Sequence, residues 1–224
     1  MRILSSYTWR INVSSKTKKV RDKWRSKAWY MVTAPPYFGN TELGAVPSDE
    51  PDKLIGRTID ATLYDVTGDF SHQYLKMYFQ INEVDGKTAH TIFKGHEYSR
   101  DYLRSLVRRR TTKVDGLFTI TTKDGYKLQV AASAFTLSRV KTSQEKIIRA
   151  IMSKILKEKA QALTMDQFAQ EIVLGKIASD IYNEAKKIAP LRHVGIRGSK
   201  LVKQATHKQP TSEEKPAGPV AEEA

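Results

Sequence analysis

The sequence predicts an α+β protein, with an antiparallel β-barrel or sandwich as its core, an inserted arginine-rich helix and a helical C-terminal region. Between residues 54 and 135 apolar and polar residues alternate, which is the period of half-buried strands. Asp85-Gly86 and Asp124-Gly125 divide this segment, and Asp-Gly pairs supply the positive φ angles of tight hairpin turns. After Phe135 the apolar period lengthens to about 3.6 residues, which is the period of helices.

Residues 1–28 are expected to form a basic arm. The run KTKKVRDKWRSK at 16–27 contains many cations, one acid (Asp22) and few apolar side chains. A segment of this composition has little to bury, so it predicts a solvated arm or an exposed helix rather than core.

The β-rich core domain is expected at residues 29–140. The Pro35-Pro36 pair excludes a regular helix, and Pro47 and Pro51 predict a polar connector that ends near Leu54. Beyond it, two alternating runs each place apolar residues on one face, first Ile59, Ala61 and Leu63, then Leu75, Met77 and Phe79. The Asp-Gly pairs join the second run to KTAHTIFK, and GLFTITTK to YKLQVAASAFT, as two antiparallel hairpins.

One helix is expected inside this domain, at about residues 99–110. Ser99 can cap its N-terminus, and Asp101 places a carboxylate at the positive end of the helix. Its two sides differ: Tyr102, Leu103, Leu106 and Val107 share the side expected to dock, and Arg100, Arg104 and Arg108 share the side expected to stay outside.

The C-terminal region, residues 141–205, predicts three helices and a basic strand or loop. Reciprocal capping patterns at Thr142/Glu145 and Thr164/Gln167 mark two helix starts. The expected helices are Ser143–Ala162, Met165–Leu174 and Ile177–Lys187, and Ile147, Ile148, Ile151, Ile155 and Leu156 are expected to form the buried stripe of the first. HVGIR after Pro190 predicts a short strand, and residues 206–224 predict a disordered tail.

The charge balance predicts a polyanionic partner. The 224 residues include 38 Lys+Arg and 24 Asp+Glu, a formal net charge of +14. The chain offers no long apolar run or amphipathic anchor for a membrane, and its polar start argues against a signal peptide. The absence of cysteine excludes disulfides, thiolate catalysis and cysteine-ligated metals.

Catalysis, a cofactor and a metal site are not expected. The five histidines lack metal-binding spacing, and HEYSR at 96–100 has Arg100 where a second zinc ligand would stand. Asp60 with Asp65, or Asp65 with Asp69, would be the candidates for a metal-dependent nuclease, but their spacing is a weak signal.

Three basic segments are predicted to bind RNA. Five arginines within residues 100–110, with one acid among them, can place guanidinium groups along a phosphate backbone, although a solvated helix would show the same pattern. Trp24 in the arm is as well suited to stacking on a base as to packing, whereas Trp29, Tyr30, Tyr37 and Phe38 are expected to be buried anchors. GIRGSK at 195–200 contains G-x-x-G but lacks the flanking helices of a KH domain, so a basic turn on phosphate is expected there. The predicted contacts are Lys16, Lys18, Lys19, Arg21, Lys23, Trp24, Arg25, Lys27, Arg100, Arg104, Arg108, Arg109, Arg110, Arg192, Arg197, Lys200 and Lys203.

Five segments in order along the chain resemble a known family. They are KAWYMVTAPPYF (27–38), KLIGRTIDATLYDVTGDFS (53–71), FKGHEYSRDYLRSLVRRRT (93–111), TTKDGYKLQV (121–130) and LGKIASDIYNEAKKIAPLR (174–192). The resemblance is to the S-three-A-e family of small-subunit ribosomal proteins shared by archaea and eukaryotes, in its archaeal branch. Its G-H-x-x-[ST]-R-D hallmark corresponds here to Gly95, His96, Ser99, Arg100 and Asp101.

This resemblance implies a structural, non-catalytic component of the small ribosomal subunit in the cytoplasm. It implies a β-rich core with flanking helices on the subunit platform, near the mRNA exit and the 3′ region of the small rRNA. The implied partners are small-subunit rRNA and neighbouring ribosomal proteins, with mRNA near its exit as a further candidate. The alternatives are a metal-dependent RNA-processing enzyme and a free-standing single-stranded RNA-binding protein. The opening MRILSSYTWRINVSSKTK (1–18) matches nothing in the family, and an acidic, proline-containing tail stands in place of the family's Pro/Lys-rich C-terminal region.

Overall fold

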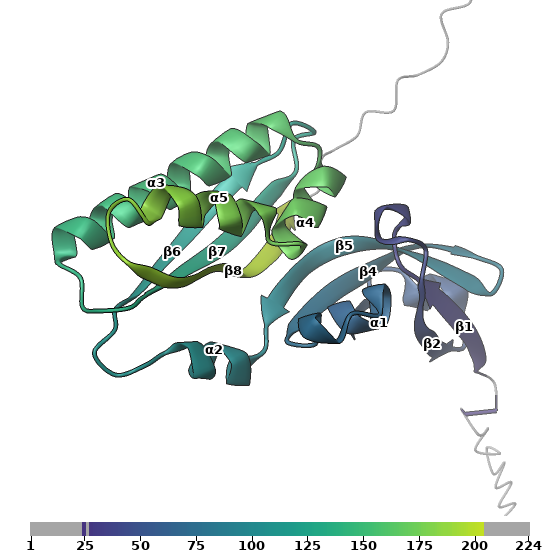
Figure 1. Cartoon of the computed structure of the whole chain (residues 1–224). Coiled ribbons are helices and arrows are strands. Elements are labelled where there is room, and N and C mark those ends of the chain that lie inside the picture. The colour runs from purple at the N-terminus through teal and green to yellow at the C-terminus, as the bar shows by residue number, and fades with distance from the viewer. Residues whose placement is uncertain (1–23, 26, 204–224) are drawn as a thin grey trace, which may run out of the picture.

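The computed structural model describes residues 24–25 and 27–203, which form one eight-stranded sheet with helices packed on it (Figure 1). The sheet order is β2-β1-β5-β8-β7-β6, and β4 pairs with β5 and β3 beside this path. The strands are β1 (Ala28–Thr33), β2 (Glu42–Ser48), β3 (Thr58–Thr62), β4 (Leu75–Asp85), β5 (Thr88–Tyr98), β6 (Lys113–Thr121), β7 (Lys127–Thr136) and β8 (Leu191–Lys203). The helices are α1 (Leu63–Thr67), α2 (Arg100–Leu106), α3 (Thr142–Ala162), α4 (Met165–Val173) and α5 (Lys176–Ala185), with short 3-10 helices at Pro36–Phe38, Pro51–Leu54 and Phe70–His72.

The α+β class is confirmed, but the predicted barrel or sandwich is wrong. The sheet does not close, because β2 and β6 end its main path as separate edges. Alternation and hairpin turns predict which neighbouring strands pair, whereas closure depends on whether distant edges meet. The two predicted hairpins are confirmed: β4 pairs antiparallel with β5, and β6 pairs antiparallel with β7.

The sheet consists of two halves joined by one short contact, visible at the centre of Figure 1. β1 to β5 form one half, and β6 to β8 form the other. Between them, β5 and β8 pair at three positions: Gly95 with Lys200, His96 with Ser199 and Glu97 with Gly198. β8 is much longer than the predicted short strand because, besides this contact, it pairs along the length of β7.

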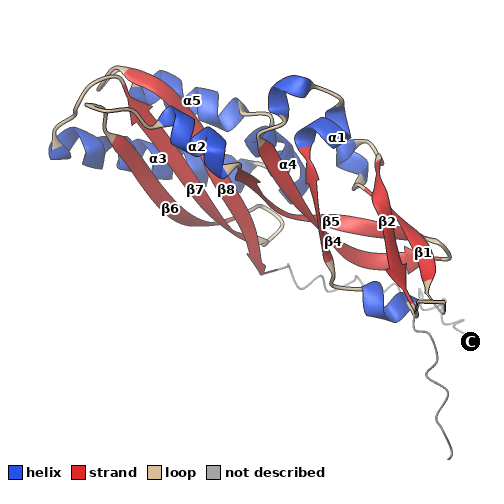
Figure 2. Ribbon diagram, turned by 90° about the horizontal axis from the view of Figure 1, so that it is seen from below, coloured by secondary structure: helices blue, strands red, loops and turns tan. Residues whose placement is uncertain are grey.

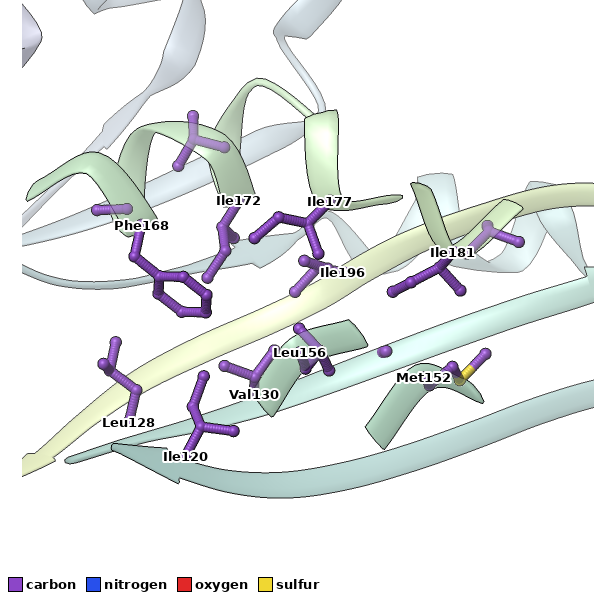
Figure 3. Packing of buried hydrophobic residues seen from close by; sticks show 14 of the residues in the cluster. Ile120, Leu128, Val130, Met152, Leu156, Phe168, Ile172, Ile177, Ile181 and Ile196 are labelled. Carbon is purple, nitrogen blue, oxygen red and sulfur yellow. The ribbon is translucent and has the colours of Figure 1, made fainter. Parts of the chain in front are cut away.

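The main core lies between β6–β8 and the three C-terminal helices. Helices α3, α4 and α5 cover one face of these strands, and their buried side chains meet those of the sheet (Figure 3). The side chains labelled there are Ile120, Leu128, Val130 and Ile196 from strands, with Met152, Leu156, Phe168, Ile172, Ile177 and Ile181 from helices. No helix within the described residues is long and apolar enough to cross a membrane.

The C-terminal helices form within one or two residues of their predicted bounds. A Thr164–Gln167 capping box starts α4, as predicted. The predicted Thr142–Glu145 box of α3 is wrong: at this helix the Gln144 side-chain oxygen accepts from the Lys141 backbone N–H at 3.2 Å. Of the predicted α3 stripe, Ile148 and Leu156 are buried and Ile151 and Ile155 are half-buried, whereas Ile147 is 49% exposed. The buried Met152 was not predicted. The turns of the helix direct Ile148, Met152 and Leu156 to the sheet, and Ile147 lies on a neighbouring side.

Strands β1 and β2 were not predicted. β2 runs through Pro47, which a strand at the edge of a sheet tolerates. β1 pairs antiparallel with β2 on one side and parallel with Thr88–His90 of β5 on the other. This long-range pairing leaves no local pattern in the sequence. Pro47 and Pro51 therefore suggested a connector instead of a strand.

Candidate nucleic-acid interface

Helix α2 docks through Tyr102 and Leu106 and leaves its arginines outside, as predicted, but Val107 of the predicted docking side is 52% exposed. The Tyr102 ring stacks on Tyr74 with centroids 3.9 Å apart, and the Tyr98 ring meets it edge-on at 5.5 Å. Burial raises the pKa of Tyr102 to about 12, with smaller contributions from Tyr74. Arg100 and Arg104 are exposed. Figure 2 shows α2 on the face of β6–β8 opposite α3 and α5.

The predicted arginine stripe is shorter than expected because α2 ends at Leu106. Val107 is extended, so Arg108, Arg109 and Arg110 are exposed in the connection to β6. The Thr111 hydroxyl donates to the Arg108 carbonyl at 2.7 Å, and Arg110 has a positive φ of 65°. The helix therefore presents two arginines, and three more follow on a loop.

The cations of β8 are spread over the whole strand. Arg192 lies at its start, next to the Leu191 that pairs with Thr136, and Lys203 pairs with Lys127 at the opposite end. Over eleven strand residues these two cations are separated by roughly 35 Å. Because the Thr112 and Thr136 backbones are hydrogen-bonded, the Arg108–Arg110 loop approaches the Arg192 end of the strand.

Two adjoining hollows gather Arg100, Arg197 and Lys200. A cavity of about 600 Å³ lies between α2 and the open face of the sheet, and its lining includes Lys94, Leu103, Leu117, Gln129, Arg197 and Lys200. A second hollow of about 360 Å³ includes Lys76 and Arg100 and shares Tyr78 and Glu97 with the first. We call the two together the junction groove, because they lie over the contact between β5 and β8.

Lys76 and Lys94 are groove cations that the sequence did not reveal. Tyr78 pairs with Gly95 and Phe79 pairs with Phe93, so Lys94 lies at a register shift between these two pairs. Its ammonium donates to the Thr58 hydroxyl at 2.9 Å. The sequence shows that these lysines are on strands, but only strand pairing decides that they face the same groove as Arg197.

The predicted cations lack carboxylate partners among the described residues. None of the described ones forms an ion pair within 4.0 Å. Elsewhere, Lys159 contacts Asp180 at 3.0 Å and Glu171 at 3.8 Å, and Arg149 contacts Glu145 at 3.3 Å. Positive charge that is not neutralised within the chain is available to a polyanion.

The arm is described only from Trp24 onward, so Lys16, Lys18, Lys19, Arg21 and Lys23 lie outside the described residues. The Trp24 ring is exposed, with the Lys27 ammonium 4.4 Å from its centroid, and Arg25 is exposed beside it. Stacking of the Trp24 ring on a base stays a prediction.

Four aromatic residues were predicted to be buried anchors. For Trp29 this prediction is wrong, because its side chain is 61% exposed. Strand alternation in β1 buries Tyr30 and Val32, so Trp29 must face outward. Tyr30, Tyr37 and Phe38 pack as predicted. Phe38 lies between Phe79 and Phe93, and the Phe93 backbone N–H donates to the Tyr37 hydroxyl at 3.1 Å.

His96 and its neighbours hold the two halves together. The Ile196 carbonyl can only accept, so Nε2 of His96 donates to it at 3.1 Å and Nδ1 accepts from the Ser199 hydroxyl at 2.7 Å. Burial lowers the pKa of His96 to about 4, despite the opposing hydrogen bond to Ile196. At Gly95, an added Cβ would lie 2.1 Å from the Ser199 carbonyl oxygen, so only glycine allows this close approach. The G-x-x-G of Gly195–Gly198 is thus part of β8, not a turn, which corrects the expected basic turn.

Asp65, one of the carboxylates considered for catalysis, has a structural role. Asp65 accepts from the backbone N–H and hydroxyl of Thr62, at 2.8 and 2.7 Å, and so caps α1. Within the part of the chain that the structure describes, no group of three or more His, Asp or Glu could hold a metal ion.

Comparisons with known proteins agree on one family. The sequence model described as the Ribosomal S3Ae family matches residues 15–205. The chain is 52% identical over 187 residues to the small ribosomal subunit protein eS1 of Aeropyrum pernix, covering 82% of this chain and 87% of that protein. Proteins of the same name from Desulfurococcus amylolyticus (50% over 191 residues, 85% and 90% covered) and Archaeoglobus fulgidus (48% over 186 residues, 82% and 88% covered) are also similar.

Proposed function

Because the chain belongs to the Ribosomal S3Ae family, we propose that it is a structural component of the small ribosomal subunit that binds rRNA, placed on the platform near the mRNA exit. The prediction that it is not an enzyme is confirmed by this membership. The observation that carries rRNA binding is the set of exposed cations without carboxylate partners among the described residues, on α2, the loop after it and β8.

The physical mechanism is counterion release together with charge-assisted hydrogen bonds to phosphate. Each cation that neutralises a phosphate releases a condensed counterion, so affinity falls steeply as salt rises. Arginine forks contact phosphate oxygens in pairs and fix orientation, but they read little sequence. Arg100 and Arg104 would contact one stretch of backbone, and Arg108–Arg110 with Arg192 would contact another.

The arrangement of the chain is part of this proposal. A basic arm (1–28) and a C-terminal region (141–205) flank the β-rich core (29–140), followed by the tail (206–224). Strands β1, which follows the arm in the sequence, and β8 belong to different halves of the sheet (Figure 1), which favours a protein held between several RNA segments and neighbouring ribosomal proteins.

Sucrose-gradient sedimentation tests the proposal. A lysate of cells that make the protein is fractionated and probed with an antibody, before and after a moderate salt wash. The protein should migrate with small subunits and remain there after the wash, because many phosphate contacts act together. A free-standing single-stranded RNA-binding protein would stay near the top of the gradient or leave the particles at moderate salt, and that result would overturn the proposal.

A further inference from the structure

The junction groove has the size and lining of a site for one nucleotide. Its larger hollow, about 600 Å³, falls within the range of pockets that hold small organic ligands. Deepening the proposed function, on which this inference rests, we propose that the groove binds a single unpaired RNA nucleotide. Its base would lie against Leu103 and Leu117, with its phosphate at Arg197 and Lys200.

The apolar side chains of the groove are exposed to water, and a flat ligand would cover them. Leu117 projects from the outer face of β6 and is 63% exposed, and Leu103 of α2 lines the same cavity. Leu117 pairs with Ala131, which pairs in turn with Gly198, so the sheet beside Leu117 carries no large side chain in the groove. A base inserted here would remove apolar surface from water, as bases do on stacking platforms.

The polar part supplies charge for phosphate and partners for a base edge. Lys200 is exposed and Arg197 half-buried, and neither has a carboxylate within 4.0 Å among the described residues. Gln129, which pairs with Lys200 in the sheet, offers an amide that can both donate and accept. These are the contacts that unpaired bases receive in RNA-binding proteins.

Two other occupants fit less well. A fully paired RNA helix would engage the cations through its phosphates but leave Leu103 and Leu117 uncovered. An acidic peptide would meet Glu97, which lines both hollows. A base carries N–H donors that the Glu97 carboxylate can accept, whereas an acidic side chain carries only more negative charge.

The test compares two RNA hairpins, one fully paired and one with a single bulged nucleotide, binding to the full chain in a fluorescence anisotropy assay. The wild type should bind the bulged hairpin about tenfold more tightly. Leu117→Asp should abolish this preference, because burying an exposed leucine side chain under a base is worth about tenfold or more. Leu137→Asp is the matched control, since Leu137 is similarly exposed, at 60%, and does not line the groove.

A second pair of variants tests the phosphate contact. Lys200→Ala should weaken binding of the bulged hairpin more than Lys203→Ala, an equal charge change on the same strand outside the groove. Equal binding of both hairpins, unchanged by Leu117→Asp, would overturn the groove proposal while leaving rRNA binding intact. Displacement of the bulged hairpin by an oligoglutamate peptide but not by free mononucleotide would also overturn it. Failure to bind either hairpin would overturn both the groove and the proposed function.

Discussion

Protonation of His96 should loosen the contact between the two halves of the sheet. Its pKa is about 4 in the folded chain, against about 6.5 for an unfolded histidine. A pKa depressed on folding means that the unfolded chain binds the proton first, so stability is full above pH ~6.5 and falls as the pH drops toward 4. At about 1.4 kcal/mol per pKa unit, His96 should account for a loss of about 3 kcal/mol across this window.

The assay is urea unfolding of the RNA-free chain at several pH values between 7 and 4, followed by circular dichroism. His96→Gln cannot titrate, and its amide can still donate to the Ile196 carbonyl and accept from Ser199. Between pH 7 and pH 4, the free energy of unfolding should therefore fall by about 3 kcal/mol less in this variant than in the wild type. Carboxylates titrate in both proteins, so their contribution cancels in the comparison.

His90→Gln makes the same substitution on β5 away from the contact, where His90 is exposed beside Asp85 at 3.3 Å, and controls for the substitution itself. The acid loss that the buried His96 produces should persist in this variant. Burial and the nearby Arg192 also lower the pKa of His193, so a smaller acid loss should remain in His96→Gln. Parallel pH profiles for the wild type and His96→Gln would refute the reasoning.

Three further substitutions probe the fold. Gly95→Ala should destabilise the chain by about 1–3 kcal/mol or more in urea unfolding, because its Cβ would overlap the Ser199 carbonyl; an unchanged midpoint would contradict the close approach. Leu156→Ala should cost about 2–5 kcal/mol and the half-exposed Ile147→Ala less than about 1 kcal/mol, and equal losses would contradict the α3 packing. Tyr102→Ala should release α2 from the sheet and speed tryptic cleavage after Arg104, with little change in the circular dichroism spectrum; unchanged cleavage would show that the stack on Tyr74 does not hold the helix.

Local chemistry predicted the parts of the fold that depend on nearby residues. Asp-Gly turns located both hairpins, and capping residues and apolar period located the C-terminal helices to within one or two residues. What failed depends on distant partners. β1 pairs with β5 across more than fifty residues, and the two halves of the sheet are joined by a β5–β8 contact that no local pattern encodes.

The candidate site shows the same division. The sequence identified Arg100, Arg197 and Lys200 as cations, but their convergence on one groove follows from strand register and the docking of α2. Lys94 was missed because only the pairing of β5 with β8 places its face of the strand at the groove. Alternation could have placed Trp29 outside, had β1 been recognised as a strand.

The salt dependence of binding to small-subunit rRNA tests the central claim most directly. Replacing Arg100, Arg104 and Arg108 with Ala should flatten the slope of log K against log salt by ~0.7–0.9 for each phosphate that is no longer neutralised. Replacing Lys53, Lys154 and Lys187 removes the same charge, but each of these lysines pairs with a carboxylate within 4.0 Å, so the slope should change little. Equal slopes for the two triple variants would contradict the claim that cations without carboxylate partners hold the RNA.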